Sequence, residues 1–171
     1  MAVNFCQQCG HAMESKTIEG REVPTCPKCG FTAWRNPLVA TMVVVETSGG
    51  IVLGRRAIEP GYGLWCLPGG FVNDDEDPAQ AAVRECMEEI NAVVELTGLI
   101  GIYHIGKTTA SSIVGIAYRG RLAGGAVMSA GPEMLELAPS RRTTYRRSRF
   151  QATGRCWTVT SGPRRWRDRH L

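Results

Sequence analysis

The chain has 171 residues, of which 43% are hydrophobic and 21% charged, a composition typical of a globular protein with room for one ordinary domain and a small module. No run of about 18 apolar residues occurs, which excludes a membrane-spanning helix within this sequence. The formal net charge of +4 conceals two different parts, because residues 1–138 carry 10 basic and 15 acidic residues, whereas residues 139–171 carry 10 arginines and one acid. The two parts therefore need separate explanations.

The first 35 residues hold four of the seven cysteines and few large aliphatic side chains, so apolar burial alone would not fold them. Two Cys-x-x-Cys pairs, each followed by glycine, are separated by 16 residues. Such a pair lets two thiolates reach one metal ion from a tight turn, and two pairs complete a tetrahedral site. We predict a zinc ribbon over residues 1–35, with a structural Zn²⁺ held by Cys6, Cys9, Cys26 and Cys29.

Disulfide bonds between these cysteines are the alternative. The N-terminal residues lack the basic and apolar regions of a secretory signal, so we expect a cytoplasmic chain, in which thiols stay reduced. A closed site of four thiolates leaves no open position for catalysis. The expected role of the metal is therefore to fold this segment.

The character of the sequence changes after Asn36-Pro37, where β-branched apolar runs begin. The expected elements are, in chain order, strands over residues 38–46 and 51–54, a long loop over 55–70, a helix over 77–90, and strands over 93–105, 113–119 and 134–137. Strands interrupted by one strong helix predict an α/β or α+β domain with a mixed sheet, which we place over residues 36–138.

The predicted helix begins with strong local signals. Asp77 is a good N-cap, Pro78 suits the first helical position, and Gln80 completes a capping box. At about 100° per residue, three carboxylates share one arc of the helix, and we place the apolar residues on the opposite face. The carboxylates are Glu85, Glu88 and Glu89, and the apolar residues are Ala79, Val83, Cys86, Met87 and Ile90.

Carboxylates crowded in this way repel one another and destabilise the helix slightly. A solvated acidic face is one interpretation. A binding site for a hard divalent cation such as Mg²⁺ is the other, because Mg²⁺ prefers oxygen ligands and keeps further positions for water and phosphate oxygens.

The order of the residues around this arc resembles the signature of the Nudix hydrolases. The pattern Gly-x5-Glu-x7-Arg-Glu-apolar-x-Glu-Glu is matched by Gly70, Glu76, Arg84, Glu85, Glu88 and Glu89. Asn91 stands where the family usually has glycine, and Ala92 where a larger aliphatic residue is usual. Asparagine is the next-best residue for a left-handed helix C-cap, so we expect the turn to form. The cysteine pairs and residues 55–70 resemble the zinc-ribbon branch of this family, which acts on ADP-ribose, FAD or NADH.

This resemblance implies a Nudix α/β/α sandwich that uses Mg²⁺ or Mn²⁺ to hydrolyse the pyrophosphate bond in nucleoside diphosphate derivatives. It favours a small nucleotide substrate of the ADP-ribose or FAD type. NADH is less favoured, because the Gln-x-Trp-x-x-Pro-x-Ser segment of NADH pyrophosphatases is absent between Ala92 and Arg121. The resemblance leaves a homodimer open.

The resemblance also implies roles for individual residues. The metal ligands would be Glu85, Glu88 and Glu89, and the Gly69 carbonyl beside Gly70 would serve as a further contact to the metal cofactor. Arg84 would position the carboxylates, and Glu76 would either hold Arg84 or support the metal ligands from behind. Glu136 resembles a later acid of the family that approaches the metals or acts as a base, with a surface charge as the alternative. The expected catalytic set is Glu76, Arg84, Glu85, Glu88, Glu89 and Glu136.

Residues 139–171 show neither a helical nor an alternating apolar period, and the final helix usual in the family is not evident. We predict an atypical, disordered arginine-rich tail. A different class of function, a zinc-ribbon protein that binds nucleic acid through this tail, remains an alternative. A Nudix-fold ligand sensor without catalysis is another, although the complete set of Arg84 and three glutamates argues against it. We expect no membrane partner, and nucleic acid only as a non-specific partner of the tail.

Overall fold

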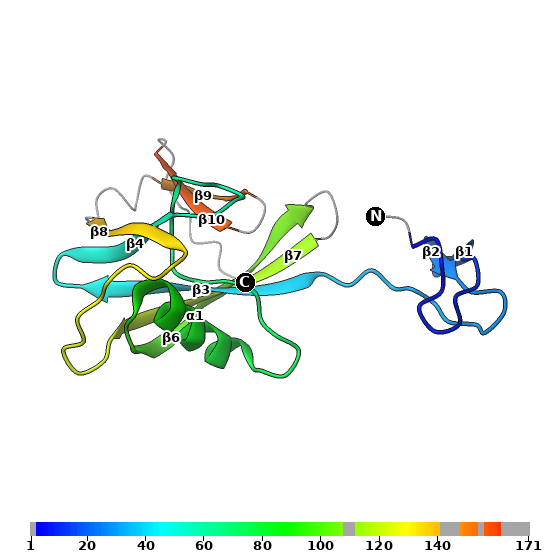
Figure 1. Ribbon diagram of the computed structural model, residues 1–171, viewed down its shortest axis with the longest axis horizontal. Helices are drawn as coiled ribbons and strands as arrows, with labels where there is room; N and C mark the ends of the chain where they lie inside the picture. Colours follow the sequence, from blue (N-terminus) through cyan, green and yellow to red (C-terminus); the bar gives the residue numbers. More distant parts are fainter. Residues whose placement is uncertain (1–2, 108–111, 141–147, 154–155, 162–171) are drawn as a thin grey trace. The chain divides into compact units, whose positions relative to one another are not determined.

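The computed structural model describes residues 3–107, 112–140, 148–153 and 156–161, and the side chains of 3–105 and 112–139. The chain forms two compact units (Figure 1). The first reaches Pro37, and the second takes Leu38–Gly106 and the described residues from Ile113 onward. Within the described ranges, no helix is both long and apolar enough to cross a membrane.

The first unit is built on a hairpin of β1 (Glu14–Ile18) and β2 (Arg21–Thr25), which pair in antiparallel register. Two isolated bridges, Phe5 to Ala12 and Thr25 to Thr32, close the segments that carry the cysteine pairs. Its buried side chains are Val23, Cys6 and Cys26. Apolar burial is therefore slight in this unit, as the sequence predicted.

The second unit is built on a mixed sheet, as predicted, in which β3 runs parallel to β7 and antiparallel to β4. The sheet order is β6-β7-β3-β4-β5-β10-β9, and β8 pairs with β4. The strands are β3 (Leu38–Thr47), β4 (Gly50–Arg56), β5 (Trp65–Cys66), β6 (Val94–Lys107), β7 (Ser112–Leu122), β8 (Met134–Ser140), β9 (Ser148–Thr153) and β10 (Cys156–Ser161).

The single described helix, α1 (Pro78–Ile90), covers one face of this sheet (Figure 1). It begins as the sequence predicted, because the Asp77 side chain accepts hydrogen bonds from the N–H groups of Ala79 and Gln80, and the reciprocal Gln80 contact completes the capping box. The core beneath α1 contains Val43, Val45, Val52, Ala82, Cys86, Ile90, Ala92 and Val94. A second core cluster contains Met42, Val44, Ile51, Leu53, Leu67 and Ala117, and a small third one contains Cys66 and Met134.

The buried face of α1 differs from the predicted one. Met87, which we placed on the apolar face, is 43% exposed, whereas Glu89, which we placed opposite, is only 3% exposed. The buried side chains of the helix are Ala81, Ala82, Cys86, Glu89 and Ile90. Compared with the predicted orientation, α1 is therefore rotated about its axis so that Glu89 faces inward. Glu89 accepts a hydrogen bond there from the Gly69 N–H.

Three further expectations differ from the structure within the described residues. The stretch 55–70 was expected to be one loop, but β5 lies within it, with Cys66 paired to Gly54 and Trp65 to Arg55. In the arginine-rich segment, β10 pairs with both β5 and β9, at variance with the expectation of a disordered tail. β8 also continues to Ser140, beyond the expected domain end at residue 138. Much of the remaining segment lies outside the described residues, so its assignment as a separate region stays a prediction.

Candidate active site

The segment that precedes α1 runs along β3 and brings two glycines against it. The Val43 N–H donates to the Pro68 carbonyl at 2.8 Å, and the Thr41 N–H donates to the Gly70 carbonyl at 2.8 Å. Gly69 has φ +151°, and a Cβ there would lie less than 3.0 Å from the Thr41 carbonyl oxygen. A Cβ at Gly70 would lie equally close to the Glu85 carboxylate. Position 69 therefore requires glycine, since any side chain would displace the backbone of β3, whereas a side chain at position 70 would displace the end of the Glu85 side chain.

Glu89 of α1 contacts the backbone of this glycine segment. Its Oε2 accepts a hydrogen bond of 2.8 Å from the Gly69 N–H. A buried carboxylate is costly unless it is hydrogen-bonded, so this bond offsets part of the cost of burying Glu89. It also joins the middle of α1 to the glycine segment, 20 residues earlier in the chain.

Arg84 gathers the remaining carboxylates around one guanidinium group. Its Nε and Nη2 donate to the two oxygens of Glu76 at 3.0 Å and 2.7 Å, which is a bidentate pair. Its Nη1 donates to Glu85 at 2.9 Å and to Glu88 at 3.1 Å. Nη2 also donates to the Phe71 carbonyl at 3.0 Å, which ties the cluster to the segment before the helix.

The electrostatic consequences follow from this arrangement. Hydrogen bonds from Arg84 lower the pKa of Glu76 to about 2, and the same contacts raise the pKa of Arg84 above its usual value. Burial raises the pKa of Glu85, which the Arg84 contacts oppose and the nearby charges of Glu88 and Glu133 reinforce. Three carboxylates share one guanidinium, and the buried carboxylate of Glu89 lies on the same helix, so the cluster is acidic and suited to a divalent cation.

The end of α1 shows how the chain departs from the family pattern without losing the turn. Asn91 takes the left-handed conformation, with φ 49°, and its N–H donates to the Met87 carbonyl. The Gly131 N–H donates to the Glu89 carbonyl at 2.9 Å, and a Cβ at Gly131 would clash with the Glu88 carbonyl. The turn that we expected is confirmed, and the loop around Gly131 lies against the end of the helix.

This loop carries an acid that no sequence motif indicates. Glu133 follows Gly131 by two residues and is close enough to Glu85 to raise its pKa. By contrast, Glu136 lies opposite Arg55 in the β4–β8 pairing, forms an ion pair with it at 3.0 Å, and is 52% exposed. Only the glycine at position 131, two residues earlier, could have drawn attention to Glu133 in the sequence.

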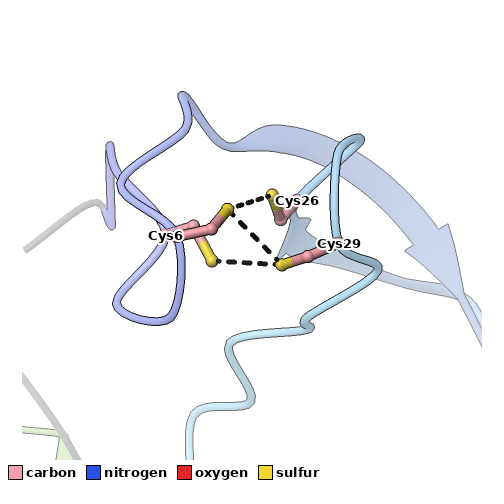
Figure 2. Close-up of side chains that lie close together, drawn as sticks. Cys6, Cys26 and Cys29 are labelled. Carbon is pink, nitrogen blue, oxygen red and sulfur yellow. Dashed lines mark hydrogen bonds between the residues drawn. The ribbon is translucent and has the colours of Figure 1, made fainter.

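The cysteine pairs of the first unit come together as the spacing predicted. The Sγ atoms of all four lie within 4.8 Å of one another, and three pairs of them are 3.6 Å apart. Figure 2 shows the Cys6, Cys26 and Cys29 side chains directed toward one another. Four thiolates about 2.3 Å from one tetrahedral Zn²⁺ would be about 3.8 Å apart, so the donor set fits this ion. None of these cysteines forms a disulfide bond.

Three other side chains, all of the second unit, have structural settings. Arg56 is buried, and its Nε donates to the Pro60 carbonyl at 3.0 Å, so it supports the loop before β5. Trp65 packs on the core cluster around Met42, and Cys86 is a buried free thiol.

The comparisons with known proteins agree with this geometry. The profile of a family described as "NUDIX domain" matches residues 35–138. The ADP-ribose pyrophosphatase of Methanocaldococcus jannaschii is 34% identical over 94 residues, which is 55% of this chain and 53% of that protein. The NAD-capped RNA hydrolase NudC of Pseudomonas aeruginosa is 34% identical over 97 residues, 57% of this chain and 34% of that protein. The chain thus spans about half or less of the length of these relatives.

Among solved structures, a NUDIX hydrolase from Nitrosomonas europaea superposes with a TM-score of 0.72 and 33% identity, covering 82% of this chain and 79% of that one. The matched family profile spans more than half of the present sequence and includes the whole Arg84–glutamate cluster. The chain therefore belongs to the Nudix family.

Proposed function

We propose that the chain is a divalent-cation-dependent hydrolase that cleaves the pyrophosphate bond of nucleoside diphosphate derivatives, with ADP-ribose as the leading substrate and FAD second. The carrying observation is the joint contact of Arg84 with three carboxylates, beside a fourth that is held by the Gly69 N–H. The names of the relatives from M. jannaschii and P. aeruginosa support a nucleotide-derived substrate.

The residues present fit Mg²⁺ or Mn²⁺. Glu85, Glu88 and Glu89 offer carboxylate oxygens, which both ions prefer. The glycine at position 70 keeps the approach to Glu85 clear, because a Cβ there would occupy the space beside that carboxylate. When bound, the cation would neutralise phosphate oxygens and lower the pKa of a bound water.

The chain's own residues would prepare this site. Arg84 holds Glu85 and Glu88 at a fixed distance from each other, and Glu76 anchors Arg84 with both oxygens. The Gly69 N–H fixes the orientation of Glu89. Acidic side chains that are restrained in advance need less reorganisation when a cation and a substrate arrive, which favours catalysis. A role for Glu136 at this site stays a prediction.

We also propose a structural Zn²⁺ in the first unit, because its four thiols have the number and separation that this ion requires. Four thiolates close the coordination sphere, so the ion would stabilise the fold of the unit and take no part in hydrolysis. A reducing, cytoplasmic environment would keep these thiols available. A homodimer remains a prediction, which sedimentation of the full chain would check.

The nucleic-acid-binding alternative depends on the arginines of the tail, all of which are numbered above 140, and those side chains lie outside the described residues. It predicts an affinity for nucleic acid that falls steeply with salt and disappears when residues 139–171 are deleted.

A hydrolysis panel tests the main proposal. The full chain with Mg²⁺ would be supplied in turn with ADP-ribose, FAD, NADH and a nucleotide sugar, and the nucleotide product would be separated by chromatography. We expect AMP from ADP-ribose and from FAD, with slower release from NADH, and no product when the cation is chelated. If the chain releases no nucleotide from any of the four substrates, the proposed activity is overturned.

A further inference from the structure

Thr41 is a polar exception in a strand that is otherwise apolar at its centre. It lies in β3 between Ala40 and Met42, and it is 1% exposed. Among the described residues, its Oγ1 has no hydrogen-bond partner. A buried hydroxyl without a partner lowers the stability of a fold, and valine would fill the same space without this cost. The presence of threonine here therefore calls for an explanation.

The direction of the Thr41 side chain follows from the alternation of the strand. Val43 and Val45 belong to the core beneath α1, whereas Met42 and Val44 belong to the cluster on the other face. Successive side chains of a strand point to opposite faces. Thr41 has the parity of Val43, so its hydroxyl lies on the face of the sheet that α1 covers.

The backbone of Thr41 lies directly beside the glycines that contact the carboxylates. Its N–H donates to the Gly70 carbonyl at 2.8 Å, and its own carbonyl oxygen faces Gly69 so closely that no Cβ fits between them. The Gly69 N–H in turn donates to Glu89. The glycine segment thus runs beside β3 at Thr41, and the Thr41 side chain lies on the sheet face covered by α1, the helix that carries Glu89.

We infer that Thr41 is a positioning residue of the acidic site, whose hydroxyl forms a hydrogen bond with a water ligand of the hydrated divalent cation bound by the glutamates. This inference rests on the proposed function. Ligands of a metal ion are commonly oriented by hydrogen bonds from neighbouring groups, and loss of such a group weakens metal binding. The hydroxyl would then increase the affinity for the cation, while the cation-free chain would be less stable than with valine at this position.

The test measures cation affinity and the stability of the cation-free chain separately. Thr41→Val, Thr41→Ser and the wild-type full chain would be titrated with Mn²⁺ by calorimetry, and their thermal unfolding would be followed without added Mn²⁺. Mn²⁺ prefers oxygen ligands, so the thiolate site does not compete for it. Thr97→Val, on the exposed side of β6, controls for the exchange itself.

We expect Thr41→Val to unfold at the wild-type temperature or above it, and to bind Mn²⁺ about 10-fold more weakly. Thr41→Ser should keep most of the affinity, and Thr97→Val all of it. Wild-type affinity in Thr41→Val would overturn the inference alone, and so would a lower unfolding temperature, because the hydroxyl would then have a structural partner. If the wild type itself does not bind Mn²⁺, the proposed function fails together with this inference.

Discussion

Glu76 and Arg84 form a two-pronged ion pair between the segment before α1 and the middle of that helix, with Nε–Oε2 and Nη2–Oε1 distances of 3.0 Å and 2.7 Å. The pair fixes the plane of the guanidinium group. Its remaining N–H groups are thereby directed at Glu85, Glu88 and the Phe71 carbonyl. Glu76 and Arg84 are not proposed metal ligands, but their ion pair sets the positions of Glu85 and Glu88, which are.

The first prediction concerns the planar shape of the Arg84 guanidinium group. Arg84→Lys keeps the charge but cannot form a bidentate pair with Glu76 while also reaching Glu85 and Glu88. We expect a fall in kcat for ADP-ribose of about 10- to 100-fold, because the carboxylates lose their fixed positions. Steady-state kinetics measure the effect, and circular dichroism checks that the fold is kept. A lysine variant with wild-type kcat would show that charge alone is sufficient.

The second prediction concerns acid stability. The pKa of Glu76 is lowered to about 2 by its Arg84 hydrogen bonds, so its ionised form stabilises the fold above its ordinary pKa. This contribution should disappear as the pH falls from about 4.5 toward 2. Glu76→Gln lacks the ionisable group, so the difference in unfolding temperature between it and the wild type should shrink over this interval. Melting curves across the pH range measure it, and a constant difference would contradict the assignment.

The third prediction concerns the close approach at Gly70. A Cβ at this position would lie less than 3.0 Å from the Glu85 carboxylate, so Gly70→Ala should displace Glu85 and weaken Mn²⁺ binding. Gly98→Ala is the matched control, because nothing lies within 4 Å of the Cβ it would add. Calorimetric titration compares the two variants. Equal affinities would show that Glu85 can move away without loss.

The fourth prediction separates two acids near the beginning of β8. The charge of Glu133 acts on Glu85, whereas Glu136 is paired with Arg55. Glu133→Gln should therefore reduce the affinity for Mn²⁺ more than Glu136→Gln, because it removes a negative charge facing the proposed ligands. The same titration measures both. A larger effect of Glu136→Gln would restore that residue as the later acid implied by the family resemblance.

The fifth prediction concerns zinc. Cys9→Ser should lower the zinc content of the purified chain and destabilise the first unit, because three thiolates hold the ion less well than four. Zinc is measured by elemental analysis, and unfolding of the unit by limited proteolysis. Cys86→Ala, which removes a thiol outside the four, should keep its zinc. Unchanged zinc in Cys9→Ser would contradict the site.

Features specified by neighbouring residues could be predicted from the sequence. The start of α1 at Asp77 and its left-handed end at Asn91 depend on contacts within a few residues, and the sulfur cluster depends on a repeated spacing. The burial of Glu89 could not be predicted this way, because its donor is Gly69, 20 residues away. The apolar pattern of the helix therefore indicated the Met87 face and was wrong.

The same reason explains the other differences. β5 has two residues, which is too short to show an alternating pattern, and its pairing with β4 is not local. Glu133 lies near Glu85 only because the loop around Gly131 packs against the end of α1. The catalytic signature indicated which acids belong together, but the structure was needed to show how the backbone holds them.

The most direct test of the account is AMP release from ADP-ribose by Glu89→Gln in the presence of Mg²⁺. The control is Glu95→Gln, in which the same change falls on an exposed glutamate of β6 that pairs with Arg121 at 2.7 Å. We predict that Glu89→Gln loses AMP release while its circular dichroism spectrum stays that of a folded chain, and that Glu95→Gln keeps wild-type turnover. Wild-type turnover in a folded Glu89→Gln chain would contradict the central claim that this carboxylate cluster is the active site.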